Sequence, residues 1–209
     1  MARYRSFYDN ANNEITFEEI FDLCNRSYDD LDGQHTVPIA GEDANISSRL
    51  LLLGYAAFKI TKPNRWSALV YRGSDDWSDW ALNNIPALIP DLIPSSPPPQ
   101  YQIGLAHARL QGDPNTVLVG HSLGGAIASY AAAQLGWAAA TIFPPPLQPG
   151  WLGDPPLAQG TRIQNYVNNL EIATMSAWIL PTHHRYGEDV WIESRGNPIE
   201  RHRRSSIVL

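Results

Sequence analysis

The chain has 209 residues, of which 44% are hydrophobic and 17% charged, and such a composition is that of a globular protein able to bury one core. A net charge of −6 argues against a nucleic-acid partner, and no apolar run is long enough for a transmembrane segment. The single cysteine, Cys24, cannot form an intrachain disulfide. We therefore expect one domain over residues 1–209, with a small molecule as its partner.

The residues before Thr16 contain neither an apolar stretch nor a small-residue cleavage site, so no signal peptide is visible. We expect a protein that is cytoplasmic or exported without a classical signal. The first helix is predicted from Thr16 to Tyr28, because Thr16 and Glu19 have the spacing of a capping box. Residues 29–43 have no clear period and indicate a loop, with room for a short edge strand.

Two strands are predicted next, over residues 50–60 and 66–71, as antiparallel neighbours joined by a turn. The second strand runs into Gly73 and Ser74. A glycine and a serine directly after a central strand can present a backbone N–H, and the Ser74 hydroxyl, to an oxyanion. The alternative is a strand-ending turn whose Ser and Asp side chains satisfy local backbone groups.

Prolines alternate with Ala, Leu and Ile through much of residues 85–100. Proline at this density prevents a long helix, so the segment is predicted to be an apolar, irregular loop. Beside a hydrolytic site, such a loop could form a lid or the wall of an acyl pocket. The alternative is a rigid loop packed on the body of the protein. A short helix is predicted over residues 101–111.

The segment Gly120-His121-Ser122-Leu123-Gly124 lies between a buried strand, 116–119, and a helix of strong helix formers, 126–135. Small residues two places on either side of Ser122 let the strand turn directly into the helix. The pattern predicts a nucleophile elbow, in which Ser122 is the nucleophile and the Leu123 N–H an oxyanion donor. The alternative is a glycine-rich turn that only packs tightly.

Further strands are predicted over residues 137–143, 162–167 and 188–193. Glu171 follows the second of these strands and places a carboxylate just past its end. The sequence has no Cys/His cluster with the spacing of a metal site, and neither a metal nor an organic cofactor is expected.

Several segments resemble, in chain order, motifs of the class 3 lipases, the fungal triacylglycerol lipase-like branch of the α/β-hydrolases. They are the hexapeptide 120–125, the strand end 70–74 with the Asp-Trp pairs behind it, residues 141–143 leading into prolines, and Asn168-x-x-Glu171. The resemblance runs from about residue 50 to the C-terminus. It implies an α/β-hydrolase fold with a mostly parallel central sheet flanked by helices.

The same resemblance implies a serine carboxylic ester hydrolase, a lipase or esterase that forms an acyl-enzyme on Ser122, with the N–H groups of Leu123 and Ser74 as the oxyanion hole. A small-molecule or lipid ester would be the substrate, with transient contact to a lipid interface. Two alternatives stay open. One is a phospholipase acting on membrane lipids, and the other is a catalytically degenerate hydrolase fold that serves as a binding module.

For the acid and the base, the resemblance points to Glu171 and His202. Glu171 stands where the family usually has aspartate, and its extra methylene makes Asp189 the reserve for the acid. In these hydrolases the base follows the acid in the chain, and His202 fits the loop beyond the last strand. The alternative for His202 is a solvated basic tail. His121 is expected to point away from the neighbouring serine.

Overall fold

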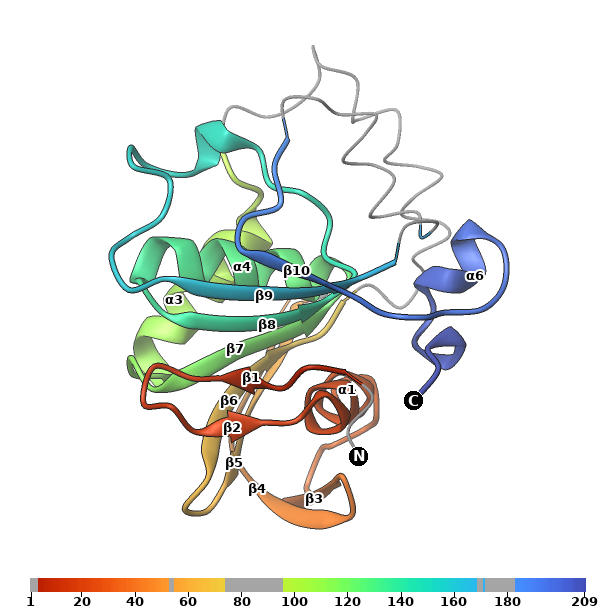
Figure 1. The fold of residues 1–209 in the computed structure, drawn as a ribbon. Helices are drawn as coiled ribbons and strands as arrows, with labels where there is room; N and C mark the ends of the chain where they lie inside the picture. Colours follow the sequence, from red (N-terminus) through yellow and green to blue (C-terminus); the bar gives the residue numbers. More distant parts are fainter. Residues whose placement is uncertain (1–3, 53–54, 74–95, 169–170, 172–182) are drawn as a thin grey trace.

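The computed structural model describes residues 4–52, 55–73, 96–168, 171 and 183–209. Its centre is an eight-stranded sheet with strand order β10-β9-β8-β7-β6-β5-β4-β3 (Figure 1). The strands are β3 (Thr36–Ile39), β4 (Glu42–Leu52), β5 (Tyr55–Lys62), β6 (Trp66–Tyr71), β7 (Thr116–His121), β8 (Ala138–Ile142), β9 (Arg162–Val167) and β10 (Glu188–Trp191). A small separate sheet pairs β1 (Phe7–Tyr8) with β2 (Glu14–Ile15).

Strands β6 to β10 run parallel, whereas β3, β4, β5 and β6 are joined by antiparallel pairing. This mixed, mostly parallel sheet confirms the predicted fold class. The register pairs Tyr71 with Gly120 and His121 with Ile142, so β6, β7 and β8 end together. Segments that follow parallel strands therefore meet at one edge of the sheet, where α/β proteins usually carry their sites.

Helices cover both faces of the sheet, with α1 (Phe17–Arg26) on one side and α3 (Pro99–Gln111) and α4 (Leu123–Leu135) on the other (Figure 1). Each side holds its own buried hydrophobic cluster. Among the described residues, no helix is long and apolar enough to cross a bilayer.

The ends of these helices follow local chemistry. The predicted capping box is present, with the Thr16 side chain accepting from the Glu19 N–H, and α1 ends at Arg26, shortly before the predicted end at Tyr28. Helix α4 ends at Leu135 and is capped by Gly136, whose φ of 73° is a left-handed conformation that suits glycine.

The region predicted as one strand over residues 50–60 belongs to two strands, because β4 ends at Leu52 and β5 begins at Tyr55. The first half of β4 contains few apolar residues, and the predicted loop 29–43 includes its first two residues. Helix α3 begins at Pro99, earlier than predicted, with proline in its first turn, where no N–H is needed. In the predicted loop 85–100, residues 85–95 lie outside the described residues. The single domain stays a prediction.

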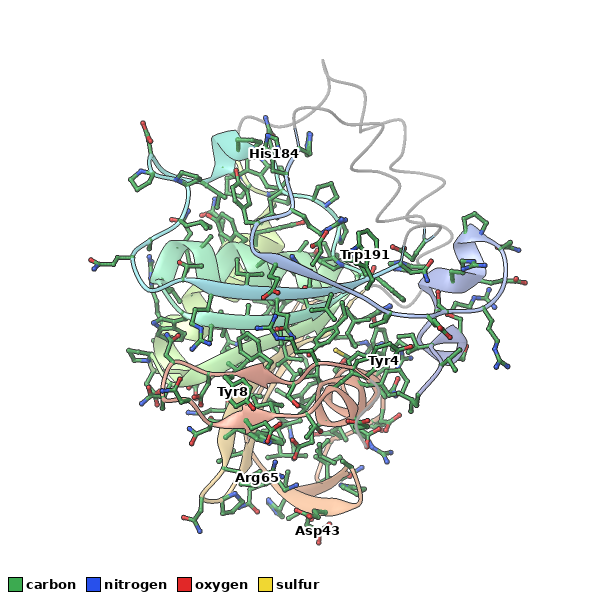
Figure 2. The ribbon with its side chains drawn as sticks, viewed as in Figure 1. Tyr4, Tyr8, Asp43, Arg65, His184 and Trp191 are labelled. Atoms are coloured by element: carbon green, nitrogen blue, oxygen red, sulfur yellow. The ribbon has the colours of Figure 1, made fainter. Side chains whose placement is uncertain are left out.

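The C-terminal segment contains two short helices, α6 (Pro198–His202) and η4 (Arg204–Ser206), and it is tied to the N-terminal residues. The Tyr4 hydroxyl donates to the Val208 carbonyl and accepts from the Glu193 N–H, both at 3.0 Å. Figure 2 shows Tyr4 close to this segment, and Trp191 at the β10 edge of the sheet. A further short helix among the described residues is η3 (Pro149–Trp151).

Candidate active site

Ser122 lies at the turn between β7 and α4 with φ 57° and ψ −129°, a conformation that costs energy for a residue other than glycine. The turn is held by the Ser122 N–H, which donates to the Ile142 carbonyl at 3.0 Å. A Cβ on Gly120 would collide with the backbone of Gly124, and one on Gly124 would collide with the Tyr71 carbonyl. Only glycine fits both positions, as a strand-to-helix elbow requires.

Leu123 is the first residue of α4, so its N–H is one of those that the helix itself cannot satisfy. The end of β6 lies against the same turn. A Cβ on Gly73 would stand 3.4 Å from the Ser122 Cβ and 2.6 Å from the His121 carbonyl oxygen. Ser74, the other predicted oxyanion donor, lies outside the described residues.

Glu171 and His202 are both buried and form a hydrogen bond between Glu171 Oε1 and His202 Nδ1. A carboxylate can only accept, so the Nδ1 atom carries the proton and Nε2 is the basic nitrogen of the neutral ring. Burial lowers the pKa of His202 well below its usual 6.5, so the imidazole is neutral at pH 7. The structure therefore brings together the two residues expected to act as acid and base.

Asn168 connects the segments that carry this pair. Its carbonyl accepts from the Glu171 N–H at 3.2 Å, and its side-chain amide donates to the Ile192 carbonyl at 2.8 Å. Arg201 of α6 donates to the Asn168 side-chain oxygen at 3.4 Å. The ends of β9 and β10 are thereby joined to α6 around one amide side chain.

Asp189, the reserve acid, is engaged elsewhere. It lies in β10, forms an ion pair with Arg185 at 2.9 Å, and accepts from the Asn165 amide at 3.1 Å. The carboxylate that accepts the hydrogen bond of His202 Nδ1 is that of Glu171.

His121 has contacts that sequence reasoning did not find. Its Nδ1 lies 3.2 Å from the Tyr28 hydroxyl, and its Nε2 lies 2.9 Å from the His202 carbonyl oxygen. Burial lowers the pKa of His121 to about 3. These partners are 93 and 81 residues away, so no local pattern could indicate them.

Phe143 is the other unpredicted neighbour of the pair. It is fully buried just after β8 with φ 49°, which is strained for an aromatic residue. Its ring centroid lies 6.0 Å from that of His202, and the His121 centroid is 5.0 Å from that of His202. The imidazole of His202 is thus buried and packed beside these two rings.

The described residues contain no group of three or more His, Cys, Asp or Glu side chains that could hold a metal ion. What they do contain is a serine in a strained turn at a helix start, and an imidazole of fixed tautomer that is bonded to a buried carboxylate and packs against His121, the residue before that serine. This is the set of groups that nucleophilic acyl transfer uses.

Residues 53–166 match a family model described as phospholipase-like, the Tle-like phospholipase domain. A search of curated proteins finds no match to the chain. The family match contains the elbow and the strands on either side of it.

Solved structures with a similar fold are fungal class 3 triacylglycerol lipases. One is a triacylglycerol lipase whose catalytic centre is formed by a serine protease triad, with TM-score 0.63, 19% identity and coverage of 83% of this chain and 78% of that chain. The triacylglyceride lipase of Rhizomucor miehei has a TM-score of 0.61 and 19% identity, and the match covers 83% of this chain and 78% of that chain. The triacylglycerol lipase of Penicillium expansum has a TM-score of 0.51 and 17% identity, and the match covers 90% of this chain and 79% of that chain. The likeness confirms the α/β-hydrolase fold predicted from the motifs.

Proposed function

The chain belongs to the Tle-like phospholipase domain family, and we propose that it is a serine carboxylic ester hydrolase that forms an acyl-enzyme on Ser122. One observation carries the proposal. The buried hydrogen bond from His202 to Glu171 fixes the imidazole tautomer beside the elbow that presents Ser122. A bare glycine-rich turn would need neither a buried carboxylate nor a buried imidazole at its side.

In the proposed reaction, His202 Nε2 takes the proton of the Ser122 hydroxyl as its oxygen attacks the ester carbonyl carbon. The tetrahedral intermediate carries its negative charge on the former carbonyl oxygen, which accepts from the N–H groups of Leu123 and Ser74. Loss of one such donor typically costs about 2.7–4 kcal/mol of transition-state stabilisation. Glu171 stabilises the imidazolium while it exists.

The imidazolium then gives its proton to the leaving alkoxide, and the C–O bond of the ester breaks to leave the acyl group on Ser122. A water molecule enters, loses a proton to His202 Nε2 and attacks the acyl carbonyl. Collapse of the second intermediate returns the proton to Ser122 and releases the fatty acid. The reaction consumes one water per ester and needs no change of oxidation state.

A lipid ester is the substrate class that we propose, with a phospholipid as the first candidate. The family description supports the phospholipid, whereas the neighbouring fungal structures are described as lipases of triacylglycerol. Both lipids present an acyl ester to the same site, so the chemistry is shared and the alcohol portion differs.

Hydrolysis of three substrates by the wild type and Ser122→Ala tests the proposal. The substrates are phosphatidylcholine vesicles, emulsified triolein and a soluble butyrate ester. We expect the wild type to release fatty acid and to be labelled by a fluorophosphonate, and Ser122→Ala to lose both. Ser129→Ala is the matched control, because it removes another buried serine hydroxyl from α4. Full activity of Ser122→Ala would refute the proposal.

The same panel separates the remaining alternatives. Faster release from phosphatidylcholine than from triolein supports a phospholipase, and the reverse supports a triacylglycerol lipase. A wild type that binds vesicles, hydrolyses nothing and takes no label would identify a binding module built on a hydrolase fold.

A further inference from the structure

We propose that His121 is a positioning residue that holds the main chain of His202 in place, and that Tyr28 fixes His121 for this task. The inference rests on the proposed role of His202 as general base. It concerns residues that the mechanism above does not use. Tyr28 lies just after α1, and His121 is the last residue of β7.

The proton positions in this contact follow from its partners. The His202 carbonyl can only accept, so His121 Nε2 must carry a proton and donate across 2.9 Å. The buried ring is neutral, as its lowered pKa requires, so His121 Nδ1 has no proton. That nitrogen therefore accepts from the Tyr28 hydroxyl at 3.2 Å. One tautomer satisfies both bonds, and the hydroxyl selects that tautomer.

Tyr28 is itself held by the segment that carries His202. The Arg204 guanidinium lies 3.9 Å from the centroid of the Tyr28 ring, a cation–π contact. Arg204 Nη1 also donates to the backbone carbonyl and the side-chain oxygen of Asn25, both at 3.0 Å. The contacts therefore form a closed network. Tyr28, just after α1, is bonded to His121, which is bonded to His202, and Arg204 of the same C-terminal segment contacts Tyr28 and Asn25 of α1.

This network also contacts Gly73, the residue before the predicted oxyanion donor Ser74. A Cβ on Gly73 would collide with the Tyr28 hydroxyl and lie 2.6 Å from the His121 carbonyl oxygen. The Tyr28 hydroxyl therefore packs where the end of β6 meets the elbow. The absence of a side chain at Gly73 leaves room for it.

The position of His202 needs such support because of where it lies. Helix α6 is only five residues long, and a helix of this length has little stability of its own. A general base must stay within hydrogen-bond reach of its proton, and a displacement of about 1 Å can cost about 100-fold in rate. The His121 donor fixes the carbonyl of the same residue whose imidazole acts as the base.

Three substitutions test the role. In His121→Gln, the amide nitrogen can stand near the former Nε2 and still donate to the His202 carbonyl. In His121→Asn, the shorter side chain places its amide near the former Nδ1 and loses that bond. Tyr28→Phe removes only the hydroxyl and keeps the ring under Arg204.

We expect kcat for the soluble butyrate ester to fall about 10–100-fold in His121→Asn, with KM nearly unchanged, as for other residues that orient a functional group. His121→Gln should recover most of the loss although it also lacks the imidazole. The kcat of Tyr28→Phe should lie between those of the two His121 variants. Because this change removes only the hydroxyl of a half-buried residue, it keeps the test valid if a His121 variant fails to fold. The rate of fluorophosphonate labelling should follow the same order.

His202→Ala separates the two levels of the proposal. If His202→Ala keeps full activity, the proposed function fails. If His202→Ala is inactive but His121→Asn and Tyr28→Phe match the wild type in kcat, the positioning role is wrong while the proposed function stands. Equal losses of kcat in His121→Asn and His121→Gln, in step with equal losses of Tm, would also overturn it, because packing alone would then explain them.

Discussion

Acidification should destabilise this protein through His121, and the size of the effect can be calculated. Burial holds the pKa of His121 at about 3 in the folded state, against 6.5 for an ordinary imidazole. Between these values the unfolded chain binds a proton that the folded protein does not, so the free energy of unfolding falls as the pH falls from 6.5 towards 3. At pH 5, about 1.5 pH units below the ordinary pKa, this group alone costs about 2 kcal/mol.

Urea unfolding at pH 7 and pH 5 measures this quantity. Between pH 7 and pH 5, the free energy of unfolding of the wild type should fall by about 2 kcal/mol more than that of His121→Gln. This corresponds to about a thirtyfold difference in the folding equilibrium constant. His202 is present in both proteins, so the difference between them measures the titration of His121 together with its electrostatic coupling to His202. His35→Gln controls for removal of a histidine, since His35 is exposed, and it should behave like the wild type. An equal pH dependence in His121→Gln and the wild type would refute the reasoning.

Three further predictions concern single side chains. Glu171→Gln should lower kcat on a soluble ester by about 10³–10⁴-fold, because an uncharged amide cannot stabilise the imidazolium. Gly124→Ala should lower the free energy of unfolding by more than about 3 kcal/mol, measured in urea, since its Cβ would collide with the Tyr71 carbonyl. Gly150→Ala is its control, because the nearest atom to a Cβ there is the Gln148 side-chain nitrogen at 3.9 Å, an ordinary contact. Burial raises the pKa of Cys24 to about 12, so iodoacetamide at pH 8 should label it only after unfolding, as mass spectrometry would show.

The elbow could be predicted because its determinants are local. The apolar strand, the glycines around Ser122 and the helix formers after it lie within a short stretch, and each limits the backbone by its own size. The capping box of α1 could be predicted for the same reason, because its two residues are three positions apart. The extent of strand β4 could not be predicted, because its polar first half is held in the sheet by pairing with β3 and β5, which a local pattern does not show.

The resemblance favours Glu171 over Asp189 as the acid, but the sequence does not show which carboxylate lies beside His202, since both follow or open a strand near the C-terminus. It depends on the register of β10 against β9, which pairs Asp189 with Asn165. In that position Asp189 forms its ion pair with Arg185, whereas Glu171 lies beyond the end of β9 and accepts from His202. The extra methylene of glutamate, which made the assignment uncertain, does not prevent the hydrogen bond.

The family match over residues 53–166 includes Ser122 but neither Glu171 nor His202. The proposed nucleophile is positioned by a strand, a tight turn and a helix that are contiguous in the chain. The proposed base instead lies on a five-residue helix, which contacts the distant residues Asn168 and His121, and His121 is in turn bonded to Tyr28. A substitution in the elbow should therefore disturb the fold and the reaction together, whereas one in Tyr28 should change the reaction first.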